Sequence, residues 1–255
     1  MPKWSRRSVL GSGAASALVG AAGSPKAFAL GAASRVDVAE IVLPSGTTSR
    51  PEAWRRLLFE VMQTTSVEVN PDAVQVAPDD PALFAHPFSV LIGTGELPEL
   101  SPASVSQLVR YLTYGGFLFV DDATGAPDGP FSRSIRQLCN RMFPTRPLSP
   151  LPGDHSVYRS YFLLDGPQGR LKQTNVLEGV TAGPITPLVY FGDDLSGALD
   201  RGDDGRDRYP VVPGGAYQRR EALKLGVNLI LYSLTSNYKH DIAHVMELLR
   251  EGRLE

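Results

Sequence analysis

The chain has 255 residues, and 25 Lys and Arg against 27 Asp and Glu give it a formal charge of −2. With 42% hydrophobic and 20% charged residues, its composition is ordinary for a globular protein. A mildly acidic chain that lacks a basic stripe is a poor binder of nucleic acid or anionic lipid, so we expect neither as a partner. Because Cys139 is the single cysteine, an internal disulfide is excluded.

The N-terminal residues are basic and precede a weakly apolar run. Lys3 and the pair Arg6-Arg7 lead into residues 9–22, which are rich in Ala and Gly and shorter than the ~20 residues that cross a bilayer. Ala27-Phe28-Ala29 then has the small-x-small pattern of a cleavage site. We interpret residues 1–29 as a twin-arginine signal peptide, which predicts a periplasmic or other extracytoplasmic location. An Ala-rich tail of a cytoplasmic protein and an uncleaved membrane anchor are the alternatives.

Cleavage after Ala29 would leave residues 30–255, a length that fits a single α/β domain without a stable transmembrane anchor. The leader carries four basic residues and no acidic one, so its removal changes the formal charge from −2 to −6. The sequence defines no cofactor and leaves the question of a bound metal open.

The first half of this domain alternates strand and helix patterns. Strands are predicted at residues 36–43, 89–92 and 117–120, with short β-rich pieces at 67–69 and 74–76. Ser49 and Ser101 are each placed to cap a helix, with Pro51 and Pro102 at its first turn. Gly115-Gly116 ends the second helix, because glycine adopts the left-handed conformation without strain.

The second half begins with a helix over residues 131–142. A proline-rich, irregular stretch at 143–165 follows, with candidate strands at 161–164 and 188–191. Residues 196–215 are rich in Gly and Asp and predict a mobile loop. Two further helices are expected at 221–234 and 241–250. Continuous apolar strands alternating with helices indicate a three-layer α/β fold with a mostly parallel sheet.

Several ordered segments carry a family resemblance that covers about Val36 to Leu249. They are Tyr111–Asp122, Phe143-Pro144, Leu151–His155 with Tyr158 and Tyr161, and Arg220–Thr235. Together they resemble the bacterial family called domain of unknown function 4159. The resemblance implies a flavodoxin-like fold, similar to class I glutamine amidotransferase domains, and relatives that are often associated with the cell envelope. One departure is Gly93-Thr94-Gly95, where many relatives would have histidine between the glycines.

Polar residues gather where the predicted strands end. Ligands of open parallel sheets bind beyond the carboxyl ends of the strands. The candidate ligand or metal pocket therefore comprises Thr94, Glu96, Asp121, Asp122, Asp154 and His155, the last two from a proline-stiffened loop that could fold over this edge. Carboxylates with an imidazole can bind a divalent cation or act as a general acid–base pair. In the structural alternative, the two strand-end aspartates cap the next turn, while Asp154 and His155 tie down their loop.

Other reactive residues lack the surroundings that their chemistry needs. Cys139 lies on a predicted helix rather than on a nucleophile elbow, which indicates a core residue. His240 and His244 share a helix face, but they lack the intervening Glu of H-E-x-x-H and a third ligand. The acidic run 200–207 fails as a calcium loop, because its twelfth position is Val211.

No complete catalytic constellation is present in the sequence, so it does not decide whether the protein is an enzyme. The leading hypothesis is an exported module of the cell envelope that binds a small ligand or a protein partner. The alternative is a hydrolase that uses Asp121, Asp122, Asp154 and His155, with or without a metal. A structural subunit of an envelope assembly is the third hypothesis. A deep polar pocket at the strand ends favours ligand chemistry, and an exposed apolar patch favours an adaptor.

Overall fold

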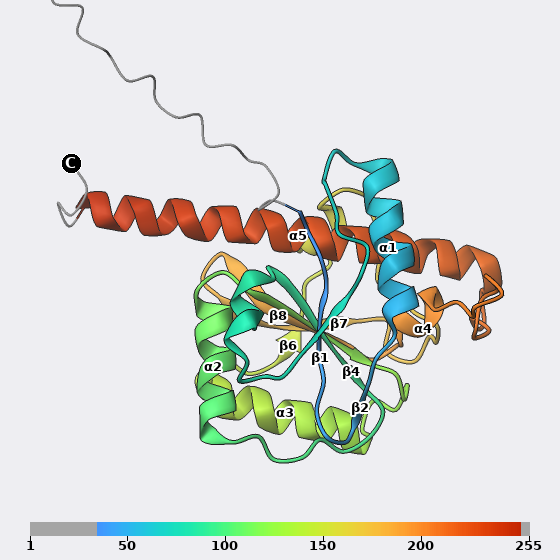
Figure 1. The fold of residues 1–255 in the computed structure, drawn as a ribbon, viewed down its shortest axis with the longest axis horizontal. Helices are drawn as coiled ribbons and strands as arrows, with labels where there is room; N and C mark the ends of the chain where they lie inside the picture. Colours follow the sequence, from blue (N-terminus) through green and yellow to red (C-terminus); the bar gives the residue numbers. More distant parts are fainter. Residues whose placement is uncertain (1–34, 251–255) are drawn as a thin grey trace, which may run out of the picture. The chain divides into compact units, whose positions relative to one another are not determined.

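Parallel strands form the centre of the domain. The computed structural model describes residues 35–250, with side chains described to residue 235, so the proposed signal peptide lies outside the described residues. The parallel strands are β1 (Ala39–Ile41), β3 (Val74–Val76), β4 (Phe88–Gly93), β5 (Phe117–Asp122) and β8 (Ile185–Phe191). Their spatial order is β3-β1-β4-β5-β8, which is the flavodoxin order. The predicted α/β fold with a mostly parallel, flavodoxin-like sheet is therefore confirmed (Figure 1).

Three antiparallel strands extend this sheet. They are β2 (Thr47–Thr48), β6 (Ser149–Pro150) and β7 (Leu177–Ala182). Strand β7 pairs with β8, β6 pairs with β7 at the sheet edge, and β2 pairs with the end of β4. These strands were not predicted from the sequence. Two of them have only two residues, and β7 reads Leu-Glu-Gly-Val-Thr-Ala, which interrupts its apolar pattern with a glycine.

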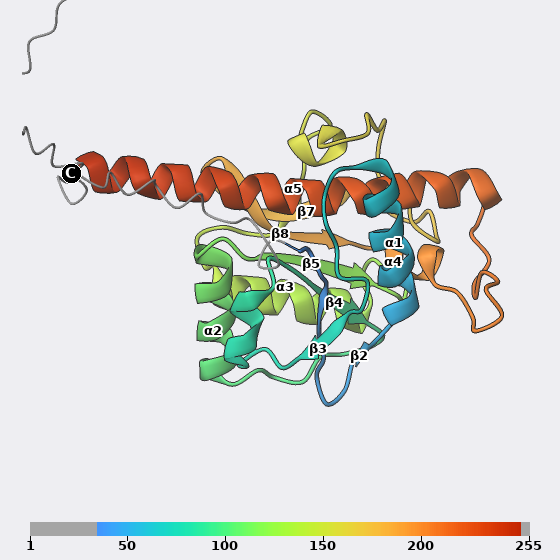
Figure 2. The ribbon, with the colours of Figure 1, turned by 45° about the horizontal axis from the view of Figure 1, so that its top comes forward.

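Helices cover both faces of the sheet. They are α1 (Pro51–Thr64), α2 (Pro102–Thr113), α3 (Pro130–Met142), α4 (Leu195–Leu199) and α5 (Gly215–Arg250), with short 3₁₀ helices at Pro81–Ala85 and Ser156–Arg159. Helices α1, α4 and α5 lie on one face, and α2 and α3 lie on the other (Figures 1 and 2). Within the part of the chain that the structure describes, we find no helix that is both long and apolar enough to cross a membrane.

The hydrophobic core has two halves, because side chains along the central strands alternate between the two faces of the sheet. On β5, Phe117 and Phe119 pack toward α1 and α5, whereas Leu118 and Val120 pack toward α2 and α3. Successive side chains of a strand point to opposite faces, so a strand that is covered on both faces must be apolar throughout. This requirement explains the continuous apolar runs from which the sequence predicted a parallel sheet.

Several local predictions need correction. Ser49 does not cap α1, because its hydroxyl donates to the buried Glu40 carboxylate and Arg50 takes the N-cap position. Ser101 does cap α2, accepting from the Ser104 amide at 3.0 Å. Residues 161–164 form no strand, because the Asn228 side chain on α5 accepts from the Tyr161 and Phe162 amides.

Two predicted features of the C-terminal third of the chain also differ from the structure. Residues 195–199 form the buried helix α4 rather than the start of a mobile loop. The two helices predicted at 221–234 and 241–250 are one continuous helix, α5. No Gly or Pro separates the two apolar patterns, so nothing in residues 235–240 breaks the backbone hydrogen bonding.

We expect Gly93→Ala to lower the free energy of unfolding by about 1–3 kcal/mol, the usual cost of overpacking a core. A methyl group at Gly93, the last residue of β4, would overlap the ring of Phe131 on α3. Gly95→Ala is the matched control, because an added Cβ there meets no atom within 4 Å. Urea unfolding of both variants tests the prediction, and an equal loss of stability in the two would contradict it.

Candidate functional site

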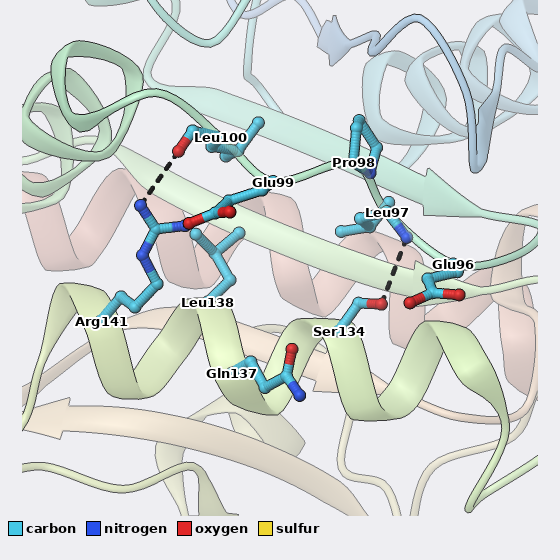
Figure 3. Close-up of a pocket in the computed structure, with 9 residues that line it drawn as sticks. All are labelled: Glu96, Leu97, Pro98, Glu99, Leu100, Ser134, Gln137, Leu138 and Arg141. Carbon is cyan, nitrogen blue, oxygen red and sulfur yellow. Dashed lines mark hydrogen bonds and ion pairs between the residues drawn. The ribbon is translucent and has the colours of Figure 1, made fainter.

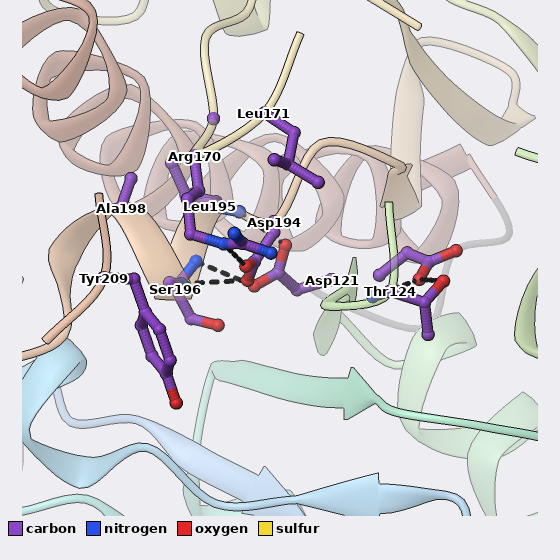
Figure 4. Close-up of polar contacts among 12 residues, drawn as sticks. Asp121, Thr124, Arg170, Leu171, Asp194, Leu195, Ser196, Ala198 and Tyr209 are labelled. Carbon is purple, nitrogen blue, oxygen red and sulfur yellow. Dashed lines mark hydrogen bonds and ion pairs between the residues drawn. The ribbon is translucent and has the colours of Figure 1, made fainter. Parts of the chain in front are cut away.

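Two buried aspartates from neighbouring strands meet at the carboxyl edge of the sheet. Asp121 is the penultimate residue of β5, Asp194 follows β8, and neither has measurable exposure. The Asp121 carboxylate accepts from the amides of Leu195 and Ser196, both at 2.7 Å, at the start of α4 (Figure 4). Asp194 caps the same helix by accepting from the Gly197 amide at 3.0 Å. The two carboxylates together therefore fix the N-terminus of α4.

Two arginines form ion pairs with Asp194. Arg50, at the N-cap of α1, and Arg170 both donate to the Asp194 carboxylate. Both guanidinium groups also lie over the Tyr209 ring, at 5.1 and 5.6 Å from its centroid. Because buried charges are tolerated only when they are paired and hydrogen-bonded, these contacts account for the presence of the Asp194 carboxylate in the interior.

The environment of Asp121 favours its protonated form. Burial, and then the neighbouring Asp194 carboxylate, raise the pKa of Asp121 to about 7, against the opposing effects of Ser196 and Arg50. Asp122, next in the chain, accepts from the amide and hydroxyl of Thr124 and from the Tyr190 hydroxyl. Burial raises the pKa of Asp122 as well. Both predicted strand-end acids are therefore engaged by internal partners.

The predicted partner loop lies at the other end of the sheet. His155 Nε2 lies 3.1 Å from the hydroxyl of Thr186, near the start of β8, whereas Asp121 pairs with Phe191 near its end. Five residues of strand at about 3.3 Å each separate the two ends by about 16 Å. The expectation that this loop folds over the carboxyl edge is wrong. The position of this loop is set by the Asn228 side chain, which donates to the carbonyl groups of Val157 and Phe162.

Local contacts of this loop indicate a structural role. His155 Nδ1 accepts from the Val157 amide at 3.2 Å, so the neutral ring carries its proton on Nε2 and donates to Thr186. Burial lowers the pKa of His155, which favours this neutral form. Asp154 is exposed, and its backbone carbonyl accepts from Arg159. The carboxylate–imidazole pair of the hydrolase hypothesis is therefore not assembled.

Thr94 and Glu96 line different hollows. Thr94 contributes to a cavity of about 450 Å³ formed with the start of α1 and the loop 200–209. Glu96 lines a separate groove of about 360 Å³ between its own loop and α3 (Figure 3). Ser134 on α3 holds this loop by accepting from the Leu97 amide at 3.2 Å. The six predicted residues thus do not form one pocket.

The Thr94 cavity lies at the switch point of the sheet. The chain leaves β1 toward one side and β4 toward the other, and ligands of doubly wound sheets bind in the crevice between two such strands. Residues from three segments, all of them polar except Pro51, line this switch-point cavity: Thr48, Ser49, Arg50, Pro51, Glu52, Thr94, Asp200, Asp203, Arg208 and Tyr209. Its charged groups include the ion pair between Arg208 and Asp200, at 3.1 Å.

Glu40 fixes the side of this cavity that α1 provides. The carboxylate of Glu40, buried on β1, accepts from the Arg50 amide at 2.7 Å and from the Trp54 indole at 2.8 Å. It also accepts from the Ser49 hydroxyl. Strand β1 and helix α1 are thereby locked together next to the cavity, so its wall is preformed.

A family model described as Domain of unknown function (DUF4159) matches residues 38–234. The chain belongs to this family. The match confirms the resemblance that the sequence segments indicated, and it spans the sheet, the switch-point cavity and most of the described chain. A comparison with curated proteins finds no match.

Some important residues of this DUF4159 domain were not predicted. Gly192-Asp193-Asp194 follows β8 as Asp121-Asp122 ends β5, so the same pattern of paired aspartates after an apolar strand could have identified it. Asp193 accepts from the amides of Gln173, Thr174 and Asn175 and so orders the segment that precedes β7. Arg50 and Tyr209 carried no recognisable signal, because their roles depend on contacts between distant segments.

Other candidates have structural explanations or fall outside the described side chains. Cys139 is buried on α3, where burial raises the pKa of its thiol to about 12, so the thiolate is disfavoured. His240 and His244 lie beyond residue 235, outside the side chains that the structure describes. Among the described residues, no group of three His, Cys, Asp or Glu side chains has a geometry that could hold a metal ion.

We expect Asp121→Asn to change how stability depends on pH. The folded pKa of Asp121, about 7, exceeds its ordinary value of 3.8, so between these values the folded state binds more protons than the unfolded state. As the pH rises through this window, Asp121 ionises in the unfolded state first, and the free energy of unfolding therefore falls. In the variant this contribution is absent, so the stability advantage of the wild type should shrink between about pH 4.5 and pH 7.5.

Urea unfolding across this pH range measures the difference. Asp128→Asn is the control, because Asp128 is an exposed residue in the loop that follows β5. A difference between the wild type and Asp121→Asn that stays constant with pH would contradict the assignment of a raised pKa.

Proposed function

We propose that this protein is an exported module of the cell envelope that binds a small polar ligand in the switch-point cavity. The observation that supports the proposal is the cavity itself, about 450 Å³ in volume and placed where doubly wound sheets bind ligands. This volume falls within the usual range for sites of small ligands. Its lining offers hydroxyl groups, carboxylates and guanidinium groups, so we expect a ligand with both donors and acceptors, such as a sugar or an amino acid.

A binding role without turnover agrees with the geometry of the acids. Asp121 and Asp122 are each held by two or more internal donors, and His155 lies at the opposite end of the sheet. A general base must reach its substrate within hydrogen-bond distance or through one water. Thr94, by contrast, is exposed and lines the cavity, and its backbone amide donates to the Gly46 carbonyl.

Thermal unfolding of the full chain with sugars, free amino acids and short dicarboxylates tests the binding role. A compound that binds only the folded state raises the melting temperature. We expect at least one class to do so, and Thr94→Trp to abolish the effect by filling the cavity. Thr145→Trp, at an exposed threonine after α3, should leave it intact. The proposal fails if no class raises the melting temperature, or if the rise survives in Thr94→Trp.

Export is proposed from the leader alone. Arg6-Arg7, the apolar run and Ala27–Ala29 support cleavage after Ala29 and release of a chain of 226 residues. We expect replacement of both arginines, Arg6→Lys with Arg7→Lys, to retain the protein in the cytoplasm, because it keeps the charge while removing the paired guanidinium groups. Fractionation followed by intact-mass measurement checks this. Lys3→Arg is the control, and export of the double variant at the wild-type level would contradict the assignment.

A further inference from the structure

A second cavity lies beside the switch-point cavity, across the loop 200–209. Its volume is about 340 Å³, and it is formed by α1, this loop and the beginning of α5. The residues that line it are Arg56, Asp207, Ala216, Arg219, Arg220 and Leu223. We call it the arginine cavity, because three of its six lining residues are arginines.

Asp207 is the single acidic residue of this lining, and several arginines share it. Its two carboxylate oxygens lie 2.7 Å from Arg56 Nη1 and 3.1 Å from Arg219 Nε. Arg201, just outside the lining, is 3.9 Å from the same carboxylate. Arg220 forms no ion pair with it and lies over the Tyr217 ring, 6.0 Å from the centroid.

The lining of the arginine cavity therefore carries three positive charges against one negative charge. Arg219 is 9% exposed, and it donates to the carbonyl groups of Ala198 and Tyr209. Burial lowers the pKa of Arg219; Asp207 opposes this, and Arg56 and Arg201 add to it. The positive charge is thus concentrated in a partly desolvated place, although the chain as a whole is acidic.

A tetrahedral oxyanion fits this arrangement. Arginine presents its donors in a planar fork that matches phosphate oxygens, and such charge-assisted hydrogen bonds are among the stronger ones. The Asp207 carboxylate already occupies part of the space between the guanidinium groups of Arg56 and Arg219, so it acts as an internal competitor for an added anion. We infer that the arginine cavity binds a phosphate group, contacted by Arg56 and Arg220.

The phosphate group could belong to a free ion or to a small monoester. Isothermal titration of the full chain with inorganic phosphate and with glycerol phosphate, each at constant ionic strength against chloride, separates the two. We expect saturable binding of at least one of them. Tighter binding of glycerol phosphate would support the inference and identify a monoester, and binding of inorganic phosphate that is at least as tight would support it and identify the free ion.

Two variants with opposite expected effects on phosphate affinity make the test specific. Arg220→Gln should weaken phosphate binding by about two- to fivefold, the usual range for a partly exposed charge contact. Asp207→Asn should tighten it by a similar factor, because the competing negative charge is removed. Arg146→Gln, at an exposed arginine after α3, should bind as the wild type does. If Asp207→Asn proves unfolded by circular dichroism, the comparison of Arg220→Gln with Arg146→Gln decides.

The inference is overturned if neither compound binds beyond chloride, or if Arg220→Gln binds as tightly as the wild type. It is also overturned if Arg208→Gln abolishes binding while Arg220→Gln binds as tightly as the wild type. In that case the anion occupies the switch-point cavity, where Arg208 lies, and the proposed function would gain an anionic ligand. Failure at the arginine cavity therefore leaves the proposed function testable on its own.

Discussion

The burial of both Asp121 and Asp194 at the carboxyl edge is the constraint on which the rest of this structure depends. Two carboxylates without measurable exposure cannot both be left uncompensated in the interior. The compensation comes from the amides of α4 and from Arg50 and Arg170, which belong to distant parts of the chain. The ends of β5 and β8, the start of α1 and the segment before β7 are therefore held at one place. Asp194 adopts a left-handed backbone, at φ 57°, to complete this arrangement.

This internal use of acidic groups explains why the conspicuous residues of the sequence do not form a reactive centre. Asp121 and Asp122 already accept from internal donors, and the loop with His155 is fixed to α5 at the opposite end of the sheet. The polar switch-point cavity lies instead where the chain leaves β1 and β4 toward opposite sides. There the lining comes from loops and the first turn of α1, supported from below by Glu40.

Much of the fold could be predicted from the sequence, because its signals are local. The apolar runs of β4 and β5, the Gly115-Gly116 pair between α2 and β5, and the prolines at the first turns of α1 and α2 indicate the order of the elements. The site was less accessible to prediction. Asp121 was identified correctly as a strand-end residue, but its hydrogen-bond partners Leu195 and Ser196 are 74 and 75 residues away in the chain, and no local pattern predicts such contacts. His155 was misplaced for the same reason, since Asn228 determines where its loop lies.

The loop 200–209 forms a shared wall between the two cavities. On one side Tyr209 packs against Arg50 and Arg170, and on the other Asp207 bridges Arg56 and Arg219. A change in the position of this wall alters both volumes at once. An occupant of one cavity that shifts this wall changes the affinity of the other cavity for its own occupant. By thermodynamic reciprocity, the second occupant then changes the affinity of the first cavity by the same factor. Because residues of this one loop belong to both linings, a substitution in the loop changes the walls of two chemically different compartments at once.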